Sequence, residues 1–274
     1  MHRWQPGISL DHLHFRATAL DRMRDFFKSR GYLEVETPYL SQFGVTDIHL
    51  HPVTATVLQQ TMYLHTSPEY PMKRLLAAGS GSIFQLARVF RDEEIGRLHQ
   101  PEFTMLEWYR VGWDHHTLLT EIDTFLQIML HCPPLVKRRY QEVFETYLGC
   151  NPIQTSIMEL QQIAKQHDLG TVLDPNTASV DDYLYLLMSH LIEPQFSALE
   201  MPVALYDFPA SQAALAKIEN GVAARFEVYF RGMELANGFY ELSDVEEQSQ
   251  RFQVDSDQRI ARDLPVNPID QRFL

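Results

Sequence analysis

The chain has 274 residues, and its 45% apolar and 22% charged residues lie close to the averages of globular proteins. This composition excludes a disordered or collagen-like chain. With 23 basic and 36 acidic side chains the net charge is −13, which disfavours a general electrostatic grip on nucleic acid or on a membrane surface. Two cysteines are too few for a disulfide-rich scaffold, and no apolar stretch approaches the roughly 20 residues that span a bilayer. We therefore expect a cytoplasmic globular protein without membrane contacts.

Apolar residues that recur every three or four positions predict several helices. The first covers residues 10–30 and ends at Gly31. A second begins at Thr66-Ser67-Pro68-Glu69, where a hydroxyl cap, a proline in the first turn and an early carboxylate are typical of a helix start. The last begins at a capping box, Ser243-Asp244-Val245-Glu246, and runs to about Arg262. Three more helices are expected within the same domain, over residues 118–130, 157–167 and 181–191.

Alternating polar and apolar residues predict two hairpins. Residues 82–90 and 101–110 form the first, with a charged loop between them. The second pairs 226–230 with 233–242 through a turn at Arg231-Gly232. Because strands and helices do not alternate strictly, their order favours an α+β fold in which helices flank an antiparallel sheet.

The first predicted hairpin carries charged groups on an otherwise apolar strand. A period of two places Phe103, Met105, Glu107 and Tyr109 on one face, and Arg91 follows the end of the preceding strand. An arginine suits a phosphate, and neighbouring carboxylates suit Mg²⁺ or an ammonium group. The composition alone favours the plainer alternative, a solvated hairpin with surface ion pairs.

A second polar group lies in the predicted strand 233–242. Strict alternation places Glu234 on the face opposite Asn237 and Glu241, but a bulge at Asn237-Gly238 would bring the three side chains to one site. An Asn-Gly hairpin turn with exposed acidic residues explains the spacing equally well. No P-loop or Rossmann glycine motif occurs in the sequence, so neither kind of nucleotide site is indicated.

Together these segments resemble the class II aminoacyl-tRNA synthetases of the lysyl type. Motif 2 of that family is similar to Phe90-Arg91-Asp92-Glu93 with His99-Gln100-Pro101-Glu102-Phe103-Thr104-Met105-Leu106-Glu107-Trp108-Tyr109. The end of motif 1 is similar to Glu36-Thr37-Pro38, and the amino-acid-binding segment to Thr66-Ser67-Pro68-Glu69-Tyr70. The metal and substrate strand is similar to Glu234-Leu235-Ala236-Asn237-Gly238-Phe239 with Glu241-Leu242. The resemblance extends from Asp11 to Gln271 and outweighs both plainer alternatives.

Within the family, the chain is most similar to the stand-alone paralogs that modify elongation factor P. Too few residues precede the first predicted helix for an anticodon-binding OB domain, and the segment 208–216 resembles the paralogs. These usually have asparagine at the positions of Asp92 and Gln100. We expect residues 1–274 to form one catalytic domain that stops before the glycine-rich motif 3 and its ATP-contacting arginine. Such a chain is expected to be marginally stable and to bind ATP weakly.

The resemblance implies a role for each matching residue. Arg91 would be the catalytic residue that clamps the α-phosphate of ATP, and Glu234 would hold Mg²⁺. The full set expected to contact ATP is Arg91, Asp92, Glu93, Gln100, Glu234 and Leu235. The two ammonium groups of a lysine-type substrate call for separate carboxylates. The residues expected to bind that substrate are Ser67, Pro68, Glu69, Tyr109, Asn237 and Glu241.

The resemblance also implies a reaction. A lysine-type amino acid, with (R)-β-lysine preferred to lysine, would be activated by ATP as an aminoacyl adenylate and transferred to a lysine of elongation factor P. The enzyme is expected to be a homodimer that uses ATP and Mg²⁺. Two alternatives stay open: a catalytically impaired binding protein of the same fold, and a lysine–tRNA ligase. The net charge of −13 disfavours tRNA binding.

Overall fold

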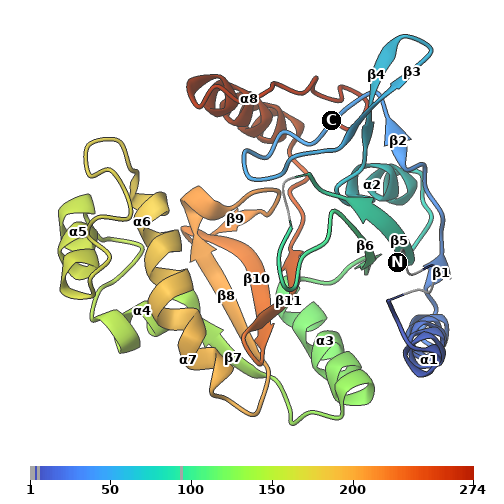
Figure 1. Cartoon of the computed structure of the whole chain (residues 1–274), viewed down its shortest axis with the longest axis horizontal. Coiled ribbons are helices and arrows are strands. Elements are labelled where there is room, and N and C mark those ends of the chain that lie inside the picture. Colours follow the sequence, from blue (N-terminus) through green and yellow to red (C-terminus); the bar gives the residue numbers. More distant parts are fainter. Residues whose placement is uncertain (1–3, 5–6, 93–94) are drawn as a thin grey trace. The chain divides into compact units, whose positions relative to one another are not determined.

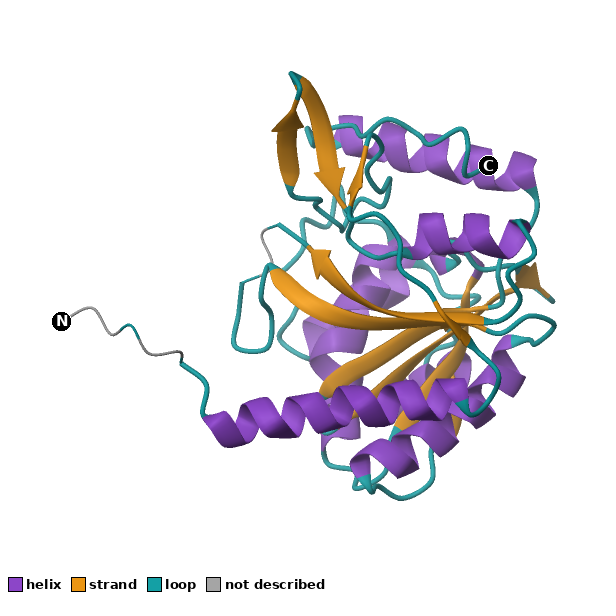
Figure 2. Ribbon diagram, turned by 90° about the vertical axis from the view of Figure 1, so that its right-hand side faces the viewer, coloured by secondary structure: helices purple, strands orange, loops and turns teal. Residues whose placement is uncertain are grey.

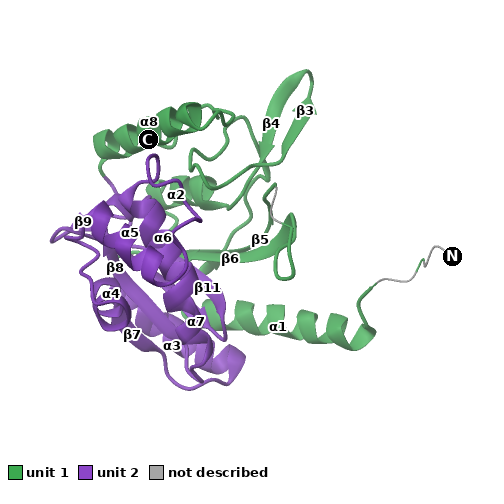
Figure 3. Cartoon of the chain, turned by 60° about the vertical axis from the view of Figure 1, so that its left-hand side comes forward, with its two compact units in different colours: residues 1–112, 244–274 green, residues 113–243 purple. Residues whose placement is uncertain are grey.

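The computed structural model describes residues 4, 7–92 and 95–274, and the chain divides into two compact units (Figure 3). Unit 1 comprises Met1–Gly112 and Asp244–Leu274, and unit 2 comprises Trp113–Ser243. Both units combine strands with helices, so the predicted α+β class is confirmed. Unit 2 contains the three predicted middle helices and a sheet of its own. Whether the two units act as one catalytic domain stays a prediction.

The described residues of unit 1 form three helices and two small sheets (Figure 1). Figure 2 shows the helices and strands of the chain in different colours. Its helices are α1 (Leu10–Lys28), α2 (Glu69–Ala77) and α8 (Val245–Ala261). Its strands are β1 (Leu33–Glu34), β2 (Leu40–Ser41), β3 (Thr54–Val57), β4 (Gln60–Leu64), β5 (Ile83–Phe90) and β6 (Glu102–Tyr109). They pair in the orders β1-β5-β6 and β2-β4-β3.

Unit 2 carries most of the helices (Figure 1). Its helical segments are α3 (His115–Leu130), α4 (Tyr140–Leu148), α5 (Ile157–Gln166), α6 (Val180–Leu187), the π-helical turn η1 (Met188–Ile192), α7 (Glu193–Ser197) and the 3₁₀ turn η2 (Ala210–Gln212). Its strands are β7 (Val136–Arg139), β8 (Val203–Pro209), β9 (Ile218–Glu219), β10 (Val222–Phe230) and β11 (Met233–Phe239). The sheet has the order β11-β10-β8-β7, and β9 pairs with β10.

The long hairpin predicted for unit 1 is confirmed. The strands β5 and β6 pair antiparallel, from Ile83 opposite Tyr109 to Phe90 opposite Glu102. On α1, the fully buried ring of Phe27 stacks on Phe84 of β5 with centroids 5.0 Å apart. Burying two such rings supplies much of the free energy that holds α1 on this sheet.

Two predicted helix caps are wrong in detail. The residue that caps α2 is Pro68, whereas the hydroxyl of Ser67 accepts a hydrogen bond from the Glu69 N–H at 3.4 Å. The cap of α8 is Asp244 rather than Ser243, since the Asp244 carboxylate accepts the N–H of Glu247 at 2.9 Å. A carboxylate at this position also interacts favourably with the positive end of the helix dipole.

The core of unit 2 lies between its helices and the strands β8 and β10. The largest cluster of buried residues includes Phe144, Leu160, Leu187, Val203 and Tyr229. Two pairings differ from the predicted antiparallel pattern, because β1 pairs parallel with β5 and β7 pairs parallel with β8. Among the described residues, no helix has the length and apolar character needed to cross a membrane.

Candidate functional site

Arg91 lies where the predicted hairpin of unit 1 begins to open. Its backbone N–H donates to Pro101 O at 2.9 Å and closes the hairpin after β5. Its side-chain Nε donates to Thr66 O at 3.3 Å, and its guanidinium carbon lies 5.3 Å from the ring centroid of Phe103. The half-buried side chain is therefore held in place by both the hairpin and the segment before α2. An arginine held in this way has lost part of its conformational freedom before it meets a ligand.

The segment Ser67–Glu69 begins α2 directly after Thr66, the residue that binds Arg91. Pro68 is buried, and the Glu69 carboxylate pairs with Lys73 Nζ at 2.6 Å, one helical turn later. Both charged side chains are largely shielded, with 19% and 14% of their surface exposed. Glu69 therefore pairs with the ammonium group of Lys73 in this structure, and its role in binding substrate stays a prediction.

Tyr109 belongs to a line of polar groups across the sheet of unit 1. Its hydroxyl donates to Glu107 Oε1 at 2.8 Å, as expected for two residues on one face of β6. Glu107 lies opposite Gln85, which is 2% exposed and accepts from the Thr37 hydroxyl at 2.9 Å. Thr37 belongs to the segment that resembles the end of motif 1. The structure thus connects that segment with the motif 2 hairpin.

Three further residues expected to contact ATP lie in the loop of this hairpin. Asp92 is exposed, and its backbone N–H donates to His51 O at 2.7 Å. Gln100 is exposed just before β6. Glu93 lies outside the described residues. The roles of these three residues stay predictions.

The second predicted hairpin, β10 with β11, is confirmed in unit 2, but its bulge lies elsewhere. Glu234 pairs with Tyr229 and Ala236 pairs with Val228, so Leu235 is the extra residue. The prediction of a bulge at Asn237-Gly238 is wrong, and so is the alternative of a turn there, because both residues lie inside β11. On the two sides of Leu235, β11 pairs with β10 in registers that differ by one residue, and Leu235 is the residue left over.

For two of the three residues, Glu234 and Asn237, the bulge at Leu235 has the consequence that was expected of a bulge at Asn237-Gly238. Asn237 lies opposite Glu227, and Glu234 lies opposite Tyr229. Because Glu227 and Tyr229 are two residues apart on β10, all four side chains share one face of the sheet. Glu234 and Asn237 are both exposed on the edge strand β11. The predicted metal carboxylate and the predicted substrate amide are thus brought to the same face.

Sequence reasoning missed a buried ionic network on that face of β10. Glu227 accepts hydrogen bonds from the Arg225 guanidinium and from the Tyr229 hydroxyl. Arg225 is 6% exposed, donates to Gln212 O at 3.0 Å and lies over the ring of Phe208. The signal was present in the sequence as a charged pair, Arg225 and Glu227, that alternates with apolar residues.

Two groups near this network, Glu193 and Tyr229, have raised pKa values. Burial, and next to it the charge of Glu227, raises the pKa of the Glu193 carboxyl. Burial with the charges of Glu227 and Glu234 also raises the pKa of the Tyr229 hydroxyl well above its ordinary range. Desolvation and like charges both disfavour the anion. On this face the Arg225 guanidinium pairs with Glu227, and the exposed carboxylate of Glu234 adds a further negative charge.

Glu241 is held by backbone pairing just beyond β11. It forms an isolated bridge with Ala216, and the N–H of Leu242 donates to Leu215 O at 2.9 Å. Ala216 ends the segment 208–216, which resembles the elongation factor P paralogs. The half-buried Glu241 is thus positioned by that segment.

Comparisons with known proteins extend over nearly the whole chain. Residues 8–264 match the protein family described as tRNA synthetases class II (D, K and N). A protein of Haemophilus influenzae (strain PittGG) is 47% identical over 283 residues, which cover 100% of this chain and 86% of the relative. A protein of Pasteurella multocida (strain Pm70) is 49% identical, over 99% of this chain and 85% of the relative. A protein of Salmonella paratyphi A (strain ATCC 9150 / SARB42) is 48% identical, over 99% of this chain and 86% of the relative. All three relatives are named elongation factor P–(R)-β-lysine ligase.

Proposed function

Because the chain belongs to the class II tRNA synthetase family of the D, K and N type, we propose that it joins (R)-β-lysine to elongation factor P with ATP. It is a ligase of the class II synthetase type, and this chemistry consumes ATP. The observation that carries the proposal is an identity of 47% or more to ligases of this name over 99% or more of the chain. That span includes the motif 2 hairpin and β11, which carry the predicted chemistry.

In the first proposed step, a carboxylate oxygen of β-lysine forms a bond to the α-phosphorus of ATP, and the bond to pyrophosphate breaks. Negative charge grows on the phosphoryl oxygens, and a positioned guanidinium stabilises it. Arg91 fits this role because Thr66 O and the hairpin hold its side chain before a substrate arrives. The products are the β-lysyl adenylate and pyrophosphate.

In the second proposed step, the neutral amine of a lysine side chain of elongation factor P attacks the carbonyl carbon of the adenylate. An amide bond forms, AMP leaves and the attacking nitrogen loses a proton. The transferred group keeps its own two amines, so the product on elongation factor P gains positive charge.

The carboxylates of Glu69 and Glu241 are proposed to bind the two ammonium groups of the substrate. The ion pair of Glu69 with Lys73 supports this, because it shows a shielded carboxylate already paired with an ammonium ion. Tyr109 is proposed to assist in binding the substrate through its hydroxyl, which donates a hydrogen bond to Glu107. Ser67, Pro68 and Asn237 complete the proposed substrate set.

Mg²⁺ is proposed to be held by the carboxylate of Glu234. This donor fits, since Mg²⁺ prefers carboxylate oxygens and the side chain of Glu234 is exposed on the edge strand β11. When bound, the ion neutralises charge on the phosphates of ATP. Leu235, as the bulged residue, sets the register that turns Glu234 to this face.

We further propose a homodimer and a cytoplasmic location. Large apolar side chains stay exposed along α1, with Leu10 at 73%, Leu13 at 44% and Phe15 at 74%. Exposed apolar side chains on the first turns of one helix support a protein partner, and a second copy is the simplest one. Light scattering coupled to size exclusion tests the dimer.

Two assays test the proposed function. ATP–pyrophosphate exchange with (R)-β-lysine, lysine and neither amino acid measures the first step, and we expect exchange only with an amino acid and fastest with (R)-β-lysine. Mass spectrometry of elongation factor P after incubation with ATP and β-lysine measures the second, with an expected gain of one β-lysyl group. No exchange with either amino acid would overturn the proposal in favour of a non-catalytic binding protein. Charging of tRNA in place of elongation factor P would overturn it in favour of a tRNA ligase.

A further inference from the structure

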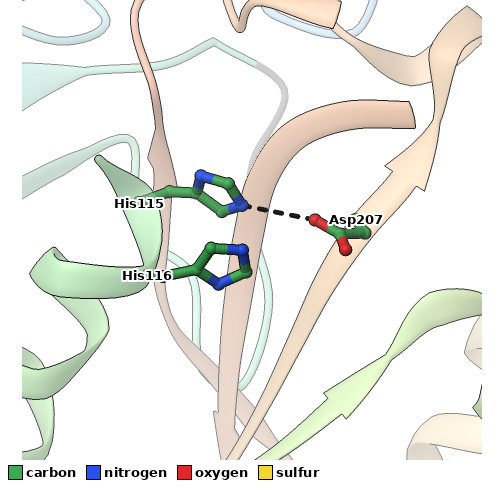
Figure 4. Close-up of side chains that lie close together, drawn as sticks. All are labelled: His115, His116 and Asp207. Atoms are coloured by element: carbon green, nitrogen blue, oxygen red, sulfur yellow. Dashed lines mark hydrogen bonds and ion pairs between the residues drawn. The ribbon is translucent and has the colours of Figure 1, made fainter. Parts of the chain in front are cut away.

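A second cluster of ligating side chains lies in unit 2, formed by residues that have no role in the proposed ligase reaction. His115 and His116 begin α3, and Asp207 belongs to β8 (Figure 4). One donor atom of each side chain lies within 4.8 Å of the donor atoms of the other two. His115 Nε2 is 3.3 Å from Asp207 Oδ1, although 92 positions separate the two residues in sequence. No other group of this kind occurs among the described residues.

The strand β8 presents Asp207 through an irregularity in its backbone. Asp207 has φ +59, a left-handed conformation that is rare inside a strand. The pairing of β8 with β10 shifts register at this point, between Ala223 and Phe226. The extra residue lies on β10, where Ala224 and Arg225 face the single residue Asp207. Aspartate tolerates the left-handed region better than most residues. Such local strain persists where the surrounding structure enforces it, and it is concentrated at functional sites.

The first turn of α3 brings two neighbouring histidines to the same place. The rings of His115 and His116 lie with centroids 4.0 Å apart and an angle of 34° between their planes. The rings of His116 and Tyr206 contact each other edge to face, with centroids 5.2 Å apart. His115 is 5% exposed, whereas His116 is exposed, so the cluster has a rigid buried end and an end open to solvent.

We propose that His115, His116 and Asp207 bind a divalent transition-metal ion of the Zn²⁺ type. Two imidazole nitrogens and one carboxylate oxygen form a donor set that suits Zn²⁺ and disfavours Mg²⁺, which takes oxygen ligands. Ligands about 2.0–2.1 Å from a tetrahedral Zn²⁺ lie about 3.4 Å from one another, so the donors need only small rotations to close on the ion. Water completes the coordination at the exposed end.

Arg139 is the charged side chain that competes with the ion. Its Nε lies 3.7 Å from Asp207 Oδ2, but 59% of its side chain is exposed, so this ion pair is weak. Asp207 has a second oxygen, Oδ1, on the side of His115. The ion would bind at Oδ1 while Arg139 stays at Oδ2, as an outer-shell partner that orients the carboxylate. The ion would thereby tie the start of α3 to β8 at the residue that faces the bulge of β10.

Binding of Zn²⁺ to the chelator-stripped 274-residue chain tests the proposal. Equilibrium dialysis against ZnCl₂ is carried out with excess Mg²⁺, so that oxygen-ligand sites are already filled. We expect one Zn²⁺ per chain and a rise in melting temperature on Zn²⁺ addition. The variants His116→Asn and Asp207→Asn are expected to weaken binding by at least about tenfold and to abolish the rise in melting temperature. His116 is exposed, and the Asp207 substitution keeps the size of the side chain. Asparagine also tolerates the left-handed backbone at position 207.

A matched control separates this site from surface histidines. His167 is exposed at the end of α5 in the same unit, so His167→Asn is expected to bind Zn²⁺ as the unaltered chain does. Melting without metal shows whether each variant is folded, and either of the two site variants suffices for the test. Failure of the unaltered chain to bind Zn²⁺, or equal binding by the site variants and the control, would overturn the proposal. Neither result depends on ligase activity.

Discussion

Gly238 of β11 lies directly opposite Phe226 of β10, and a Cβ atom at position 238 would lie 2.2 Å from Phe226 Cζ. Phe226 is 1% exposed, so its ring cannot turn aside into solvent. The glycine is needed because a strand passes close to a buried ring, rather than because the chain turns there. This contact fixes the backbone next to Asn237 and explains the Asn-Gly pair without a hairpin turn.

Gly238→Ala is therefore expected to lower both stability and activity. Overpacking against Phe226 costs about 1–3 kcal/mol, and the shift of β11 moves Asn237. Thermal melting and pyrophosphate exchange measure the two effects. Gly96→Ala is the control, since its nearest contact is His99 Nδ1 at 3.8 Å. Equal melting temperatures for the two variants would contradict the prediction, because they would show that the chain accommodates a Cβ atom at position 238 beside Phe226.

Arg91→Ala is expected to abolish β-lysine-dependent pyrophosphate exchange with little change in melting temperature. The substitution removes the guanidinium but keeps the backbone hydrogen bond to Pro101 O that closes the hairpin. Arg88→Ala is the matched control, because Arg88 is a half-exposed arginine of β5 that pairs with Glu102 at 3.7 Å. Exchange that survives in Arg91→Ala, or falls equally in both variants, would remove Arg91 from the proposed mechanism.

Glu241→Gln is expected to weaken binding of (R)-β-lysine much more than binding of ATP. Loss of one charge from a desolvated ion pair costs roughly 2–5 kcal/mol. Titration calorimetry with each ligand separately measures the difference. Glu219→Gln, at an exposed position of β9, is expected to change neither affinity. An equal loss for both ligands in Glu241→Gln would point to metal binding or to misfolding instead.

Glu193→Gln is expected to raise the melting temperature at neutral pH. Burial and the charge of Glu227 raise the pKa of Glu193 above its ordinary value of 4.5, so ionisation costs more in the folded chain than in the unfolded one. This destabilisation is absent below the ordinary value and grows as the pH rises through the raised pKa. The difference from the unaltered chain should therefore disappear below pH 4.5. The exposed Glu200→Gln is the control, and a difference that does not depend on pH would contradict the prediction.

Segments with strong local signals were predictable from the sequence. The spacing of apolar residues predicted α1 over 10–30, and the structure has Leu10–Lys28. The predicted middle helix 181–191 corresponds to α6, which continues as the π-helical turn Met188–Ile192. The short strands β3, β7 and β8 were not predicted. Strand β7 consists of Val136–Arg139, and three of its four residues are basic, so it lacks the alternating pattern and depends on its parallel partner β8.

The segments proposed to carry the chemistry could be located from the sequence, because each motif is a short run whose residue types and spacing are local. Arg91, Glu69 and Glu234 could all be named from such runs. Which side chains share a face depends instead on how the strands pair in the folded chain. The bulge at Leu235 depends on the register that β11 takes against β10, and a shift by one residue reverses every side chain beyond it.

The contact between His115 and Asp207 also depends on the tertiary structure, and here the two residues are far apart in sequence. Each residue belongs to an element with an ordinary local sequence, and 92 positions separate them. Their contact depends on the packing of α3 and on the left-handed backbone of Asp207, which faces the bulge of β10. Local patterns carry no information about such distant partners, because the free energy that selects them comes from burial in the folded core.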